Sequence, residues 1–63
     1  MNRPWTIYQL ACVAALSVAG AALSDIAETV ARPVREIDLA LWALVGREPG
    51  QALIRLNGHG VLT

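Results

Sequence analysis

The sequence predicts an all-α protein: a single transmembrane helix, a short amphipathic interfacial helix and a short extramembrane tail. The first observation is that the 19 residues from Trp5 to Leu23 carry no formal charge. A helix of that length spans about 28 Å, close to the ~30 Å hydrocarbon core of a bilayer. The second is that 56% of the residues are hydrophobic but only 5% are aromatic. The apolar content is largely alanine, leucine and valine, and small alanines would bury little area in a water-soluble core.

Three interpretations of the uncharged segment compete. A transmembrane helix would place Trp5 and Tyr8 at a membrane interface, together with Trp42 from further along the chain, because amphipathic rings are favoured there. A secretory signal peptide would use Arg3 as its basic region and residues 19–21 as a small-residue cleavage site, so that the exported chain begins near residue 22. A buried helix of a soluble assembly would normally be shorter or carry a polar stripe. The sequence favours the membrane span.

The charges that follow this segment suggest a hinge. Residues 1–24 are predicted to form the N-terminal tail and the transmembrane helix, beginning near Pro4, which suits a first helical turn. Residues 25–32 are predicted to extend the same helix, because Glu28 and Arg32 stand four residues apart in the order that favours an ion pair. Asp25 and Glu28 also have the spacing of a capping box, so a new helix could start there. Pro33 disfavours helix at the residue before it and should end this segment.

Residues 33–46 are predicted to form the amphipathic interfacial helix. Pro33 opens it and Gly46 closes it. Its helical part reaches only about 20 Å, too short to cross a bilayer. The predicted apolar face consists of Val34, Ile37, Leu41 and Leu44. Residues 47–63 are predicted to be the extramembrane tail, in which 47–50 form a turn, 51–56 form a helical turn or an edge strand, and 57–60 form a loop.

The best candidate for a functional surface is a face of small residues on the first helix. At 100° per residue these positions cluster on one side, and small side chains let two helices approach closely. The predicted helix-packing interface is Ala11, Ala15, Ala19 and Ala22. Alanine is also a common, helix-favouring residue, so the same pattern is compatible with a face that has no partner.

The sequence offers little that resembles catalytic or metal-binding chemistry. Cys12 is the only cysteine and His59 the only histidine, and His59 has no companion ligand beside its flanking glycines. We therefore expect no enzymatic activity, no cofactor and no metal site, and leave lipid or pigment contacts open. Five arginines balance five acidic residues. This balance supplies no basic excess, so nucleic acid is not an expected partner.

These features predict a small accessory subunit that stabilises a larger integral membrane complex. The expected partners are the bilayer and other transmembrane subunits, in a bacterial inner or intracytoplasmic membrane with the orientation open. Complexes of photosynthesis or respiratory electron transport are favoured by analogy, since single-helix subunits are abundant in them. The alternatives are a regulatory membrane peptide that binds a transporter or sensor, a self-assembling pilin-like or pore-like peptide, and an exported peptide.

Overall fold

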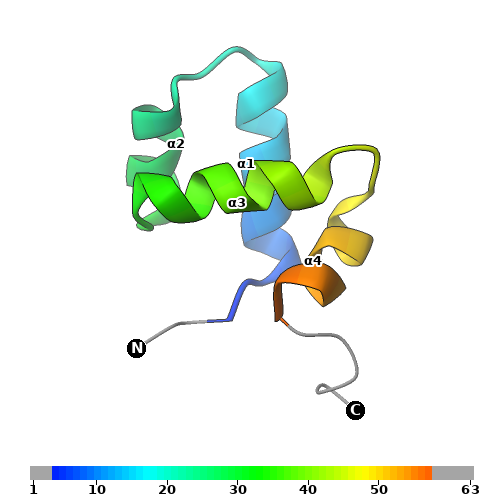
Figure 1. Ribbon diagram of the computed structural model, residues 1–63. Helices are drawn as coiled ribbons and strands as arrows, with labels where there is room; N and C mark the ends of the chain where they lie inside the picture. Colours follow the sequence, from blue (N-terminus) through cyan, green and yellow to red (C-terminus); the bar gives the residue numbers. More distant parts are fainter. Residues whose placement is uncertain (1–3, 58–63) are drawn as a thin grey trace.

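The computed structural model describes residues 4–57, which form four α-helices and no strand. α1 spans Ile7–Val18, α2 spans Leu23–Val30, α3 spans Val34–Leu44 and α4 spans Pro49–Asn57. α2 runs back alongside α1, α3 crosses both helices, and α4 packs near the start of α1 (Figure 1). The prediction of an all-helical chain is confirmed for this range.

The predicted transmembrane helix, and with it the integral single-pass membrane localisation, is wrong. Within residues 4–57, every helix is too short or too polar to cross a bilayer. α1 has 12 residues, which correspond to about 18 Å. It ends in a Schellman turn, because the Ala21 N–H donates to the Leu16 carbonyl at 3.0 Å and Gly20 adopts a φ of 90°. The uncharged segment therefore reverses direction, and the predicted continuation into residues 25–32 is also wrong.

The start of α1 is set by a capping box instead of by Pro4. The Thr6 hydroxyl accepts from the Gln9 backbone N–H at 3.1 Å, and the Gln9 side chain accepts from the Thr6 N–H at 3.2 Å. This reciprocal pair satisfies two backbone donors that have no partner inside the helix. The Thr-x-x-Gln spacing was readable in the sequence, and it places the first helical residue at Ile7.

A three-residue turn, residues 31–33, connects α2 to α3. α2 begins after an extended Ala22 and is capped at its end by Ala31, which is left-handed with a φ of 59°. Pro33 caps α3, so the predicted helix break at this proline is confirmed. The capping box suggested for Asp25 is not formed, because α2 already begins at Leu23 and has no side-chain cap.

Further along the chain, the local signals mark the end of α3 but not the ends of α4. α4 begins at Pro49, inside the predicted turn 47–50, and includes Asn57, the first residue of the predicted loop 57–60. α3 lies within the predicted range 33–46 and ends just before Gly46, whose φ is 67°. For residues 51–56 the sequence is compatible with either a helical turn or an edge strand. In the structure these residues belong to helix α4.

The core lies where α1, α2 and α3 meet. Its largest fully buried side chains are Leu10, Val13, Ile26 and Ile37. Four alanines are also buried and let the helices approach closely: Ala27, Ala40, Ala43 and Ala52. The alanines, which were expected to bury little area, thus contribute part of the core.

One arginine ties the elements together at the base of this core. Arg32 is only 6% exposed, and its guanidinium donates to the Pro4 carbonyl at 2.8 Å and to the Gln9 Oε1 at 3.0 Å. It also forms an ion pair with Glu36 at 3.0 Å and lies over the Trp5 ring at 4.0 Å. We refer to Arg32, Trp5, Gln9 and Glu36 as the Arg32 cluster. The predicted Glu28 partner is exposed, and Arg32 turns to Glu36 instead.

The last helix is attached to the same cluster through a side-chain amide. The Asn57 side chain accepts from the Trp5 backbone N–H and donates to the Trp5 carbonyl, both at 2.9 Å. These two bonds join positions 52 residues apart. The end of α4 is therefore held against the start of the described chain.

We predict that Arg32→Lys lowers the free energy of unfolding by about 2–4 kcal/mol, because a lysine ammonium cannot reach three acceptors and stack on an aromatic ring at once. Urea titration followed by circular dichroism measures this change. Arg35→Lys, at an exposed neighbouring arginine, serves as the control and should change stability by less than about 0.5 kcal/mol. Equal effects of the two substitutions would mean that the Arg32 cluster is not a stabilising feature.

A second prediction concerns the reversal after α1. Gly20→Ala should destabilise the fold by about 1 kcal/mol, because a side chain is disfavoured at a φ of 90° although nothing lies within 4 Å of the new Cβ. Gly50→Ala is the matched control, since Gly50 lies in α4 and its new Cβ would make an ordinary 3.8 Å contact with Ile7. Thermal unfolding should show no loss for the control. A continuous helix across residue 20 would reverse this order, because alanine favours helix there.

Candidate functional site

The side of α3 that faces away from the core is the most distinctive surface of the described chain. Ile37, Ala40 and Ala43 point into the core and are buried. The opposite side remains exposed, and we call the part of it that follows the first turn the outer face: Asp38, Leu39, Trp42 and Val45. Large apolar side chains on a small surface of this kind are typical of contact sites.

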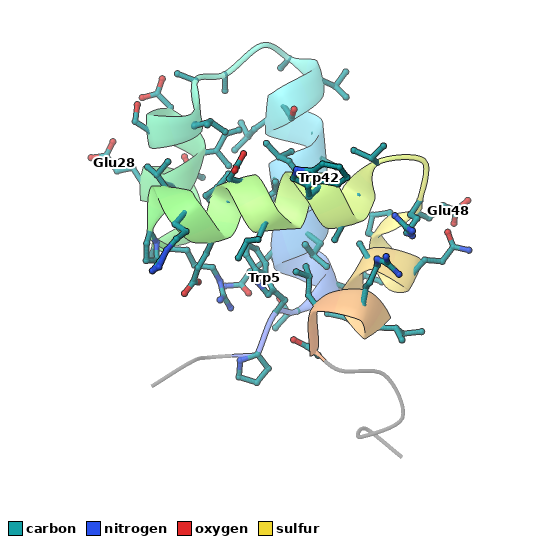
Figure 2. The ribbon with its side chains drawn as sticks, in the orientation of Figure 1. Trp5, Glu28, Trp42 and Glu48 are labelled. Atoms are coloured by element: carbon teal, nitrogen blue, oxygen red, sulfur yellow. The ribbon has the colours of Figure 1, made fainter. Side chains whose placement is uncertain are left out.

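Trp42 is the most prominent residue of the outer face. It is 72% exposed, next to Leu39 at 56% and Val45 at 65%. Figure 2 shows Trp42 lying over α3, whereas Trp5 lies below it. Tryptophan supplies a large contact area with few rotatable bonds, so an exposed tryptophan beside other apolar side chains suits a binding surface.

A hollow lies beside Trp42, between α3 and α4. Its volume is about 320 Å³, and it is lined by Leu39, Trp42, Ala43, Arg47, Arg55 and Leu56. This size is at the lower end for small-molecule sites, which enclose about 300–1,000 Å³. Because the hollow is open and the described residues that line it include no carboxylate, hydroxyl or imidazole, it suits the insertion of a side chain better than catalysis.

The polar groups of the hollow are two arginines from different elements. Arg47 Nη1 donates to the carbonyl oxygens of Ala43 and Val45, at 3.3 and 3.2 Å, which anchors this guanidinium at the end of α3. Its Nε and Nη2 donors make no described bond. Arg55, on α4, forms no described hydrogen bond or ion pair. The hollow therefore combines apolar side chains with two guanidinium groups, and both have N–H donors that make no described hydrogen bond.

The described residues contain no group of three or more His, Cys, Asp or Glu side chains that could hold a metal ion. Cys12 is a half-buried free thiol on α1. His59 lies outside the described residues, so the expectation about it is not addressed.

The structure distributes the sequence-predicted site residues over both surface and core. The four alanines of the predicted packing interface are all exposed, but only Ala11 and Ala15 lie on α1, since Ala19 and Ala22 are the caps on either side of the reversal. Their role as a packing interface stays a prediction.

The three aromatic residues that were predicted to lie at a membrane interface are found in different places. Trp5 is buried in the Arg32 cluster, whereas Tyr8 is 85% exposed on α1 and Trp42 lies on the outer face. No single surface brings the three rings together.

The apolar face predicted for the interfacial helix, which corresponds to α3, points mostly toward the core. Ile37 is fully buried, and Leu41 and Leu44 are half-buried against the core. Val34 is 44% exposed at the start of α3. Within this set, the helical periodicity therefore marked the side of α3 that packs against the core.

Neither Arg47 nor Arg55 belongs to the site predicted from the sequence. Residues 47–50 show only a turn signal, and α4 has no continuous apolar pattern in the sequence. The two arginines meet at one hollow only because α4 folds back beside α3.

No protein-family model, curated protein or solved structure matches the chain. Nothing in these comparisons connects it to photosynthesis, electron transport or a membrane complex, so those predictions are not retained.

The two tryptophans predict a simple spectroscopic result. Trp42→Phe should leave an emission spectrum shifted to shorter wavelength and poorly quenched by iodide, because the remaining Trp5 is only 8% exposed. Trp5→Phe should leave a spectrum that iodide quenches efficiently, since Trp42 is 72% exposed. Similar quenching of both variants would contradict the described positions.

Proposed function

We propose that this chain is a small, non-enzymatic adaptor that binds another protein through the outer face of α3. The observation that carries the proposal is the exposed apolar row of Leu39, Trp42 and Val45 beside a hollow bordered by Arg47 and Arg55. Tryptophan and arginine are the residues most enriched where binding energy is concentrated in protein interfaces. This proposal retains the accessory role predicted from the sequence, which is to bind a partner protein. It does not retain the predicted membrane span.

The charge of the described chain supports a protein partner over a nucleic acid. Residues 4–57 contain four arginines and five acidic residues, and Arg32 is buried in an ion pair. Asp38 lies on the outer face itself. Binding to a phosphate backbone depends on several surface cations that displace counterions, and this surface has few.

A specific feature of the backbone favours a second candidate, DNA binding. α2, the three-residue turn and α3 form a helix–turn–helix, in which α3 runs across α1 (Figure 1). One side of α3 is exposed. In DNA-binding proteins with this arrangement the second helix enters the major groove. Arg35, Arg47 and Arg55 would then contact phosphates. The apolar and acidic character of the outer face makes this the weaker candidate.

Site-specific photo-crosslinking in the source cells tests the proposal. A benzophenone amino acid replacing Trp42 should yield a discrete adduct with one protein, because this position would lie inside the interface. The same amino acid replacing Glu28, which is exposed on α2 away from the outer face, serves as the control (Figure 2). Adding Leu39→Glu should reduce the adduct at position 42 by about tenfold, since it places a charge in an apolar contact.

The possible outcomes separate the two candidates. A protein adduct at position 42 and none at position 28 supports the adaptor. An adduct that nuclease treatment removes supports the DNA-binding candidate and contradicts the adaptor. Equal adducts at both positions, or none at position 42, contradict the proposed role of the outer face.

A further inference from the structure

We infer that the partner segment is an acidic amphipathic helix, with an apolar side chain in the hollow between α3 and α4 and carboxylates on Arg47 and Arg55. This inference rests on the proposed adaptor function and names the chemistry of its partner. It follows from the composition of the hollow, the state of its two cations and the geometry of the outer face.

The residues that line the hollow indicate which charge its partner carries. The described chain has nearly balanced charge, yet the lining of this hollow contains two arginines and no acidic residue. The remaining lining residues are Leu39, Trp42, Ala43 and Leu56. A partner that covers these apolar side chains also removes water from the guanidinium groups. Burial of a charge without a counter-charge is costly, so the covering segment must supply carboxylates.

The two arginines differ in how firmly their guanidinium groups are held in position. The guanidinium of Arg47 is already oriented by the Ala43 and Val45 carbonyls. A guanidinium has five N–H donors, so it can bind a carboxylate while it keeps these bonds. Arg55 forms no described ion pair and is exposed at the end of α4. Arg47 would therefore fix the position of one carboxylate, and Arg55 would add an adjustable second contact.

The spacing of the outer face selects a helical partner. Leu39, Trp42 and Val45 follow one another at intervals of three residues, which correspond to about 4.5 Å along the helix axis. A partner helix presents apolar side chains at intervals of three and four residues, and its row can pack along this one. A partner that binds as a β-strand would need a strand edge for its backbone hydrogen bonds, and residues 4–57 contain no strand.

Selection from a display library tests this inference with the full chain. The library is a helical peptide scaffold with randomised residues on one face, panned on the wild-type protein and counter-selected on Trp42→Ala. Enriched peptides should carry Leu, Met or Phe flanked by Asp or Glu one helical turn away. Arg55→Glu should weaken binding of the best peptide at least about tenfold in a fluorescence anisotropy titration.

Arg35→Glu is the matched control. Arg35 is also an exposed arginine, but it lies in the first turn of α3, before the outer face, and it does not line the hollow. We expect this substitution to change the affinity less than about threefold, because Arg35 precedes the row of Leu39, Trp42 and Val45 and its charge lies outside the contact. Circular dichroism of both variants checks that the fold is retained.

Each result has a defined meaning. Enrichment of basic or uncharged peptides, equal effects of Arg55→Glu and Arg35→Glu, or no enrichment that depends on Trp42 would overturn the inference. The adaptor proposal is judged separately by the crosslink at position 42. A protein adduct there without selection of acidic helices would leave the adaptor standing and refute only the partner chemistry.

Discussion

The buried guanidinium of Arg32 is the constraint on which the rest of the fold depends. It lies in the turn between α2 and α3, so its position is set by both helices at once. Its contacts reach the first described residue, the capping box of α1, the first turn of α3 and the Trp5 ring. A charge at this depth is tolerated only where such partners surround it, so these elements must be placed together. Asn57 extends the constraint to α4 by holding the Trp5 backbone.

The small size of the chain explains why this polar constraint matters. A domain of about 60 residues buries a limited apolar core and is close to the limit of independent stability. Alanines such as Ala40 and Ala52 are fully buried here, which brings helices close but contributes little area per residue. Hydrogen bonds to a charged group supply specificity that the apolar contacts alone would not, because they are satisfied in one arrangement only.

The same arrangement produces the outer face. The side of α3 that carries Ile37 is used against α1 and α2, so Trp42 on the other side has nothing to cover it within the described chain. α4 is held at its end by Asn57, and it places Arg55 across the hollow from α3. A surface whose groups are already positioned loses less entropy on binding, which favours a docking role for it.

The sequence by itself determined the helical class, the break at Pro33 and the end of α3 near Gly46, because proline and glycine act through their own backbone geometry. The Thr6 and Gln9 capping pair was equally local and readable. Only the tertiary structure decided that the segment from Trp5 to Leu23 turns back at Gly20, since a long apolar run has the same pattern in lipid and beside other helices. It also decided that Arg32 pairs with Glu36 rather than Glu28, and that Arg47 and Arg55 share a hollow. Gly20 and the four-residue spacings around Arg32 are local signals, but each is compatible with more than one arrangement, and the packing of distant residues selects one of them.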